Sequence, residues 1–100
     1  MFAVTRTYTG ASALMDAMEQ RRSEVENLLT TVPGFVSYFA IRSGDGMTSF
    51  TVCDDQAGVD ETTRRASEWV RENLADVKIA PPIVNRGEVF IALGSVSAHV

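Results

Sequence analysis

The pattern of hydrophobic and polar positions divides the chain into stretches of two kinds. Runs rich in β-branched and aromatic residues, each bounded by glycine, proline or polar residues, predict strands. Between them lie two longer segments whose apolar residues return every three or four positions, the spacing of one face of an α-helix. The element order is therefore β-α-β-β-α-β. The four predicted strands cover residues 2–9, 35–42, 47–53 and 87–93.

The first helical segment begins near Ser12, whose hydroxyl we expect to cap it by accepting from an unpaired amide of the first turn. It ends at Pro33-Gly34, because proline disfavours helical geometry in the residue before it. One uninterrupted helix is predicted between these points. Its apolar stripe consists of Leu14, Met15, Met18, Val25, Leu28, Leu29 and Val32.

The second helical segment covers residues 56–77. Its outer side carries Glu61 with Arg64 and Arg65, at spacings that stabilise a helix by a few tenths of a kcal/mol per pair. Its apolar positions are Val59, Thr63, Ala66, Val70, Leu74 and Val77, with Trp69 beside them.

The two middle strands are joined by "SGDG", residues 43–46, in which Gly44 and Gly46 can take the positive φ that a tight hairpin turn requires. Right-handed crossovers then place both helices on one face of a four-stranded antiparallel sheet with strand order 4-1-3-2. This is a ferredoxin-like α+β sandwich. One hundred residues is the length of one domain, so we assign residues 1–100 to a single domain with a short C-terminal tail from about residue 94.

The opposite face of this sheet should be polar at every second position, because the helices cover only one face. The second strand does not follow this rule: Phe39 and Ile41 lie on one face, and Val36 and Tyr38 on the other. An exposed apolar area above about 400 Å² is more than soluble monomers usually leave bare. We therefore expect a homodimer whose sheets pack face to face and build a barrel of eight strands.

Composition excludes several classes of protein. The net charge is −4 and the only lysine is Lys78, whereas nucleic-acid binding needs clustered basic residues. The only cysteine, Cys53, excludes an internal disulfide framework. No apolar run approaches the roughly 20 residues that span a bilayer, and the N-terminus has no secretory pattern. We therefore expect a cytoplasmic protein without a membrane or nucleic-acid partner.

A family resemblance follows from the element order, the "VPGF" junction before the second strand, the hairpin into "TVCDD" and the helix "ETTRRASEWVRENL". Together they resemble the dimeric α+β barrel superfamily, and most closely its antibiotic-biosynthesis-monooxygenase-like branch. That superfamily includes cofactor-free oxygenases of polycyclic phenols and quinones, haem-degrading enzymes, lactone isomerases and proteins without known activity. The resemblance implies a small-molecule-binding dimeric barrel that acts as a cofactor-independent monooxygenase or isomerase on a hydrophobic or aromatic metabolite. The alternative is a non-catalytic ligand carrier or protein-interaction module.

Candidate catalytic and metal-binding motifs are few. Haem degradation needs an axial ligand, and the only histidine, His99, lies outside both predicted helices. Cys53 has no histidine to activate it, and we interpret it as a small buried residue. Asp54 and Asp55 precede a helix, where aspartate caps the helix and complements its dipole. We therefore expect no cofactor and no metal, and we assign no catalytic residue.

Aromatic and arginine side chains remain as candidates for ligand binding. Tyrosine and tryptophan combine an apolar body with a polar tip, which suits a pocket for a flat aromatic ligand. Arginine can hold a carboxylate or stabilise a developing oxyanion. The pattern leaves open which strand face lines the lumen. The candidates are Tyr8, Tyr38, Arg6, Arg42, Trp69 and Arg86.

Overall fold

A computed structural model describes residues 1–94 of the chain, so His99 and the rest of the predicted tail lie outside the described residues. The element order β-α-β-β-α-β is confirmed, with the first helical segment divided in two. In chain order the elements are β1 (Phe2–Tyr8), α1 (Ser12–Gln20), α2 (Arg22–Thr30), β2 (Phe35–Ser43), β3 (Gly46–Cys53), α3 (Gln56–Asn73) and β4 (Ile83–Glu88).

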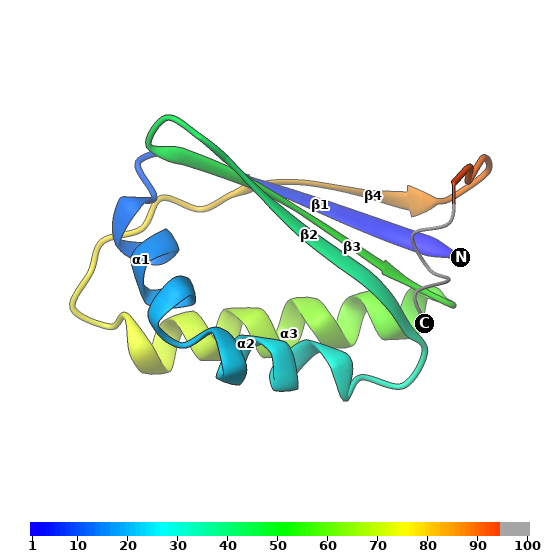
Figure 1. Ribbon diagram of the computed structural model, residues 1–100, viewed down its shortest axis with the longest axis horizontal. Helices are drawn as coiled ribbons and strands as arrows, with labels where there is room; N and C mark the ends of the chain where they lie inside the picture. Colours follow the sequence, from blue (N-terminus) through cyan, green and yellow to red (C-terminus); the bar gives the residue numbers. More distant parts are fainter. Residues whose placement is uncertain (95–100) are drawn as a thin grey trace.

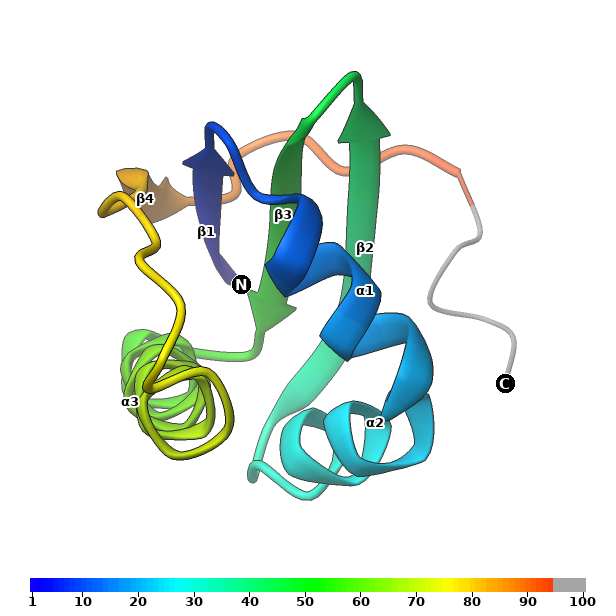
Figure 2. The ribbon, with the colours of Figure 1, turned by 90° about the vertical axis from the view of Figure 1, so that its left-hand side faces the viewer.

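The four strands form one antiparallel sheet in the order β2-β3-β1-β4, which confirms the predicted ferredoxin-like topology. The central pair, β1 and β3, is in register from Phe2 opposite Cys53 to Tyr8 opposite Met47. All three helices lie on the same side of the sheet, and α2 and α3 run next to each other below it (Figures 1 and 2). The architecture is a two-layer α+β sandwich.

The core fills the space between the sheet and the helices. Alternate residues of the two central strands point into it, because successive side chains of a strand face opposite sides. Apolar residues at both ends of this layer are buried, whereas its middle contains polar side chains. The buried strand residues are Val4, Arg6, Met47, Ser49, Thr51 and Cys53.

The prediction of one continuous first helix is wrong. The helix breaks at Arg21, whose φ of −115° and ψ of 37° lie outside the helical range. The apolar stripe has a gap at this point, because Arg21 and Arg22 occupy the positions that would continue it between Met18 and Val25. The prediction of a Ser12 cap is also wrong, since Ser12 is already helical and no side chain caps α1.

The last strand lies earlier in the chain than the predicted residues 87–93. Its pairing with β1 runs from Thr7 opposite Ile83 to Phe2 opposite Glu88, with one further bond from the Val89 N–H to the Met1 carbonyl. The second helix is also shorter than the predicted residues 56–77, since α3 ends at Asn73.

Glycines allow two close approaches in the fold. Gly44 takes the positive φ predicted for the hairpin turn, at 60°, but Gly46 does not. A Cβ at Gly46 would instead lie 2.8 Å from the Tyr8 carbonyl oxygen. In the first turn of α3, a Cβ at Gly58 would lie 2.9 Å from the Cβ of Cys53, so the helix packs directly on the end of β3.

The face of the sheet opposite the helices is uncovered and mixes apolar with polar side chains. Its large apolar residues are Phe39, Ile41, Phe50 and Ile83, with exposed fractions of 50%, 51%, 38% and 67%. Thr7 and Thr48 lie on the same face with their hydroxyls 3.3 Å apart. As expected, this second face is not uniformly polar. Among residues 1–94, no helix has the length and apolar character needed to cross a membrane.

Candidate functional site

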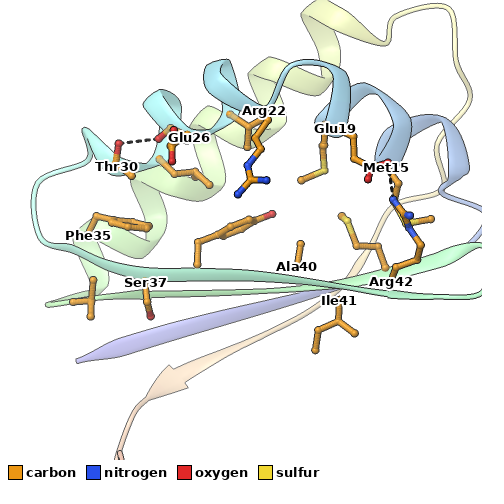
Figure 3. Close-up of a pocket in the computed structure, with 16 residues that line it drawn as sticks. Met15, Glu19, Arg22, Glu26, Thr30, Phe35, Ser37, Ala40, Ile41 and Arg42 are labelled. Carbon is orange, nitrogen blue, oxygen red and sulfur yellow. Dashed lines mark hydrogen bonds and ion pairs between the residues drawn. The ribbon is translucent and has the colours of Figure 1, made fainter. Parts of the chain in front are cut away.

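A pocket of about 680 Å³ opens between β2 and the helices α1 and α2 (Figure 3). Its walls are apolar and come from both layers of the sandwich. On β2, Ala40 points toward the helices and Ile41 away from them (Figure 3). The apolar lining of this outer pocket includes Met15, Met18, Val25, Leu29, Phe35, Val36, Ala40 and Met47, with the ring of Tyr38.

Four charged residues line the same pocket, and all of them are exposed: Glu19, Arg22, Glu26 and Arg42. Arg42 donates from Nη2 to Glu19 Oε1 at 2.9 Å and lies with its Nε 3.4 Å from the sulfur of Met15. Arg22 reaches from α2 toward the sheet (Figure 3). The outer pocket thus combines apolar walls with charged side chains, one of which, Arg22, extends toward the sheet.

A second, smaller cavity of about 40 Å³ lies deeper, between the centre of the sheet and the helices. Its polar lining comes from Arg6, Tyr8, Tyr38, Ser49 and the indole of Trp69. The two cavities are adjacent, because both are lined by Met18, Val25, Leu29 and Tyr38. This inner cavity has room for one small group, since a water molecule occupies about 30 Å³ in the liquid.

The Arg6 guanidinium is the main polar feature of the inner cavity. The residue is only 5% exposed. Its Nη1 donates to the Thr51 hydroxyl at 3.5 Å and its Nη2 to the Thr63 hydroxyl. Thr63 in turn donates to the Val59 carbonyl at 3.0 Å, so its oxygen is left to accept from Arg6. Among residues 1–94, Arg6 makes no ion pair with a carboxylate.

The groups around Arg6 are neutral at physiological pH. Burial raises the pKa of Tyr8, although the charge of Arg6 opposes this shift. Burial likewise raises the pKa of Tyr38, against the charge of Arg6 and the contact with the Ser49 hydroxyl. Burial also raises the pKa of the Cys53 thiol. The same desolvation lowers the pKa of Arg6, but the guanidinium stays protonated because its ordinary pKa is so high.

Four of the six predicted ligand-binding residues meet at the inner cavity: Arg6, Tyr8, Tyr38 and Trp69. Tyr38 and Arg42 also line the outer pocket. Arg86 lies apart from both cavities and is paired with Asp60 at 2.6 Å on the surface. Both cavities lie on the strand face that the helices cover.

Trp69 serves two roles in this region. It is buried in the core with Leu14 and Met47, and its ring borders the inner cavity. Its Nε1–H donates to Glu24 Oε1 at 2.6 Å, which ties α3 to α2. The prediction that Trp69 is buried beside the apolar stripe is therefore confirmed.

Sequence reasoning missed the hydroxyl groups that surround Arg6. Ser49 lies opposite Arg6, and Thr51 opposite Val4, across the β1–β3 pairing. Both alternate along β3 with outward-facing residues. With the register of β1 and β3 known, this alternation would have placed both hydroxyls on the same face of the sheet as Arg6. Thr63 gave a weaker signal, because it occupies an apolar position of the α3 stripe.

Asp55 and Cys53 have structural roles in the described chain. Asp55 caps α3, since its Oδ1 accepts from the Gly58 N–H at 2.9 Å, as predicted. Cys53 is buried, as predicted. Within residues 1–94, no three His, Cys, Asp or Glu side chains lie close enough together to hold a metal ion. The "SGDG" segment forms the hairpin turn between β2 and β3.

Solved structures with the same fold are numerous, although no protein-family model and no curated protein sequence matches the chain. A protein of unknown function from Nitrosomonas europaea, NE2512, aligns with a TM-score of 0.70 and 19% identity over 92% of this chain and 91% of its own. The ActVA-Orf6 monooxygenase of Streptomyces coelicolor, solved with the ligand nanaomycin D, gives 0.66 and 20% identity over 92% and 89%. A dimeric ferredoxin-like protein from an uncultured marine organism gives 0.67 and 10% identity over 92% and 95%.

These similarities concern the fold. Proteins described as antibiotic biosynthesis monooxygenases are among the structures that match. The chain therefore has the ferredoxin-like fold that these proteins share, which confirms the fold that the resemblance in the sequence implied. At 10–20% identity, the likeness assigns no activity to this chain.

Proposed function

We propose that this protein binds a flat, hydrophobic small molecule, such as an aromatic metabolite, in the outer pocket. The size and lining of the pocket carry this proposal. Its volume of about 680 Å³ falls within the range of about 300–1,000 Å³ that is usual for ligand sites. Apolar residues make up the larger part of its lining, as is typical of such sites, and charged residues from α1, α2 and β2 line it as well. The similarity in fold to a monooxygenase solved with nanaomycin D supports the same class of ligand.

We further propose that the protein acts as a homodimer joined through the uncovered face of the sheet. Phe39, Ile41 and Phe50 form an apolar cluster there, and Ile83 lies on the same face beyond Thr7 and Thr48. A second copy would cover it, and a two-fold contact needs only this one surface. The fold is shared with a dimeric ferredoxin-like protein, which supports the arrangement. The two sheets would then form the eight-stranded barrel, and both ligand pockets would lie outside the interface.

A catalytic role is the second candidate, as a cofactor-independent monooxygenase or isomerase acting on the bound metabolite. It is favoured by the position of Arg6, a buried cation beside the pocket that could stabilise an oxyanion as it develops on the ligand. Against it, the described residues that line the inner cavity include no carboxylate and no histidine to serve as a general base. A carrier without catalysis needs neither group.

Ligand titrations monitored by the fluorescence of Trp69, the only tryptophan, test the binding proposal. We expect 1,4-naphthoquinone or 1-naphthol to change this emission in the parent protein. Ala40→Phe fills the outer pocket and should weaken binding by about tenfold or more. Ala13→Phe adds the same ring on the exposed surface of α1 and should leave binding unchanged. Equal binding by Ala40→Phe and the parent would place the ligand elsewhere.

Oxygen uptake separates the enzyme from the carrier. A monooxygenase that converts 1-naphthol to a quinone consumes molecular oxygen in proportion to product, without an added cofactor. Recovery of unchanged 1-naphthol, with no oxygen uptake above a protein-free control, would identify a carrier.

A further inference from the structure

The buried charge of Arg6 indicates what kind of ligand the pocket accepts. A guanidinium carries five N–H donors. Within residues 1–94, two hydrogen bonds draw on them, one from Nη1 to Thr51 and one from Nη2 to Thr63. Both acceptors are neutral hydroxyls. Donors remain on both terminal nitrogens, in the fork that matches the two oxygens of a carboxylate.

No charge in the described protein compensates this cation. The titratable groups whose charge acts on Arg6 are Tyr8, Tyr38 and Cys53, and all three are neutral near pH 7 because burial raises the pKa of each. Buried charges in proteins are normally paired or bind a ligand, since removing a lone charge from water is costly. An anion that enters the cavity would supply the missing partner.

The cavities set the size of that anion. The inner cavity, at about 40 Å³, holds a small group and not a whole metabolite. The outer pocket, at about 680 Å³, holds a fused aromatic system. Tyr38 and Met18 line both, so the two spaces are adjacent, and the inference requires that a group attached to a ring in the outer pocket pass between these side chains toward Arg6.

We propose that Arg6, held in place by Thr51 and Thr63, forms an anion subsite, so that the ligand is an aromatic carboxylic acid whose carboxylate pairs with Arg6. The ring system lies in the outer pocket and the carboxylate in the inner cavity. This inference rests on the proposed function, because it assigns a chemical class to the ligand of the same pocket.

The test compares 2-naphthoate with 2-naphthamide, two probes of nearly the same shape that differ in charge. Titration calorimetry with the full-length parent protein should give an affinity for the acid that is about tenfold or more above that for the amide, because hydrogen bonds to charged partners are the stronger ones. The preference should persist in about 0.5 M NaCl, because buried ion pairs are screened less than exposed ones.

Variants locate the charge that is responsible. Arg6→Met keeps an apolar side chain of similar length and should abolish the preference for the acid, lowering the affinity for the amide by much less because a neutral carbonyl makes the weaker hydrogen bond. Arg6→Lys keeps the charge but not the fork and should retain part of the preference, which protects the test if Arg6→Met fails to fold. Arg86→Met removes an arginine that lies outside both cavities and should behave as the parent does.

Three results would overturn the inference. If the acid and the amide bind the parent equally, the pocket binds aromatic ligands but has no anion subsite, and the proposed function stands alone. If Arg22→Met or Arg42→Met, and not Arg6→Met, abolishes the preference, the charge that matters lies in the outer pocket. If neither probe binds the parent, the proposed aromatic pocket fails, and the anion subsite fails with it.

Discussion

Replacing Trp69 by alanine tests whether the layer between α2, α3 and the sheet is packed as described. Trp69 is buried in the core among Ala11, Leu14 and Met47, and its indole N–H donates to Glu24. Truncation removes this packing and leaves a cavity continuous with the inner cavity.

The expected loss is about 3–5 kcal/mol of unfolding free energy, the usual cost of truncating a buried tryptophan. Whole domains of this size have about 5–15 kcal/mol in total. For about 100 residues, each kcal/mol shifts the melting temperature by about 4–8 °C, so the melting temperature of Trp69→Ala should fall by at least about 12 °C. Trp69→Phe keeps a buried ring and loses the hydrogen bond and part of the area, so its loss should be smaller.

Far-UV circular dichroism at fixed protein concentration measures the effect, because association makes the melting temperature concentration-dependent. Tryptophan fluorescence is unsuitable, since Trp69 is the only tryptophan. Ser67→Ala changes an exposed residue of the same helix and should melt like the parent. A shift of less than about 4 °C for Trp69→Ala would mean that the indole is not part of the packed core, and its role in contacting a ligand would come first.

Four further predictions follow from the structure. Light scattering at micromolar concentration should give twice the chain mass of 10.9 kDa, and Phe50→Asp, on the uncovered face, should give the monomer mass. Asp55→Ala should lower the unfolding free energy by about 1 kcal/mol in urea titrations, and Asp55→Asn by much less, because asparagine is also a good cap. Hydrogen bonds from Arg64 and Arg65 lower the pKa of Glu61 to about 2 from 4.5, so the stability it contributes is present above about pH 4.5 and is lost as the pH falls toward 2. Between about pH 4.5 and 2 the urea midpoint of Glu61→Gln should therefore fall less than that of the parent. An equal fall in both proteins would contradict the prediction. Purified protein should be colourless and metal-free by absorption and elemental analysis, and a Soret band, a flavin spectrum or stoichiometric zinc would each contradict this.

The sheet was largely predictable from the sequence, because its determinants are local. Alternation and turn residues fixed where three of the strands lie, and chirality fixed their order. The position of β4 was not predictable in this way, because it depends on which residues pair with β1. Residues 89–93 have the composition of a strand, yet Phe90 is 87% exposed. The break at Arg21 was visible as a gap in the apolar stripe, but regular spacing on either side of it suggested one helix.

The candidate site could be predicted in part. Arg6 and Tyr8 share a strand face by simple alternation. Tyr38 lies on the same face because β2 pairs with β3 and places it opposite the buried Thr51. The choice between the two faces of the sheet needed the helices to be in place. The outer pocket depends on how α1 and α2 pack against β2, which no residue pattern encodes. Arg86 is paired with Asp60 on the surface and lines neither cavity. The sequence did not reveal this pairing, because the two residues lie far apart along the chain.

The close packing of Gly58 on Cys53 makes the reactivity of the Cys53 thiol a measure of local unfolding. Cys53 is the only thiol in the chain and is fully buried where the first turn of α3 covers the end of β3. A thiol-modifying reagent can react only in moments when this turn separates from the strand, since the thiolate must be accessible to attack. The rate of labelling in native conditions therefore measures the free energy of that opening, and comparing it with global unfolding would show whether this end of the sandwich opens independently.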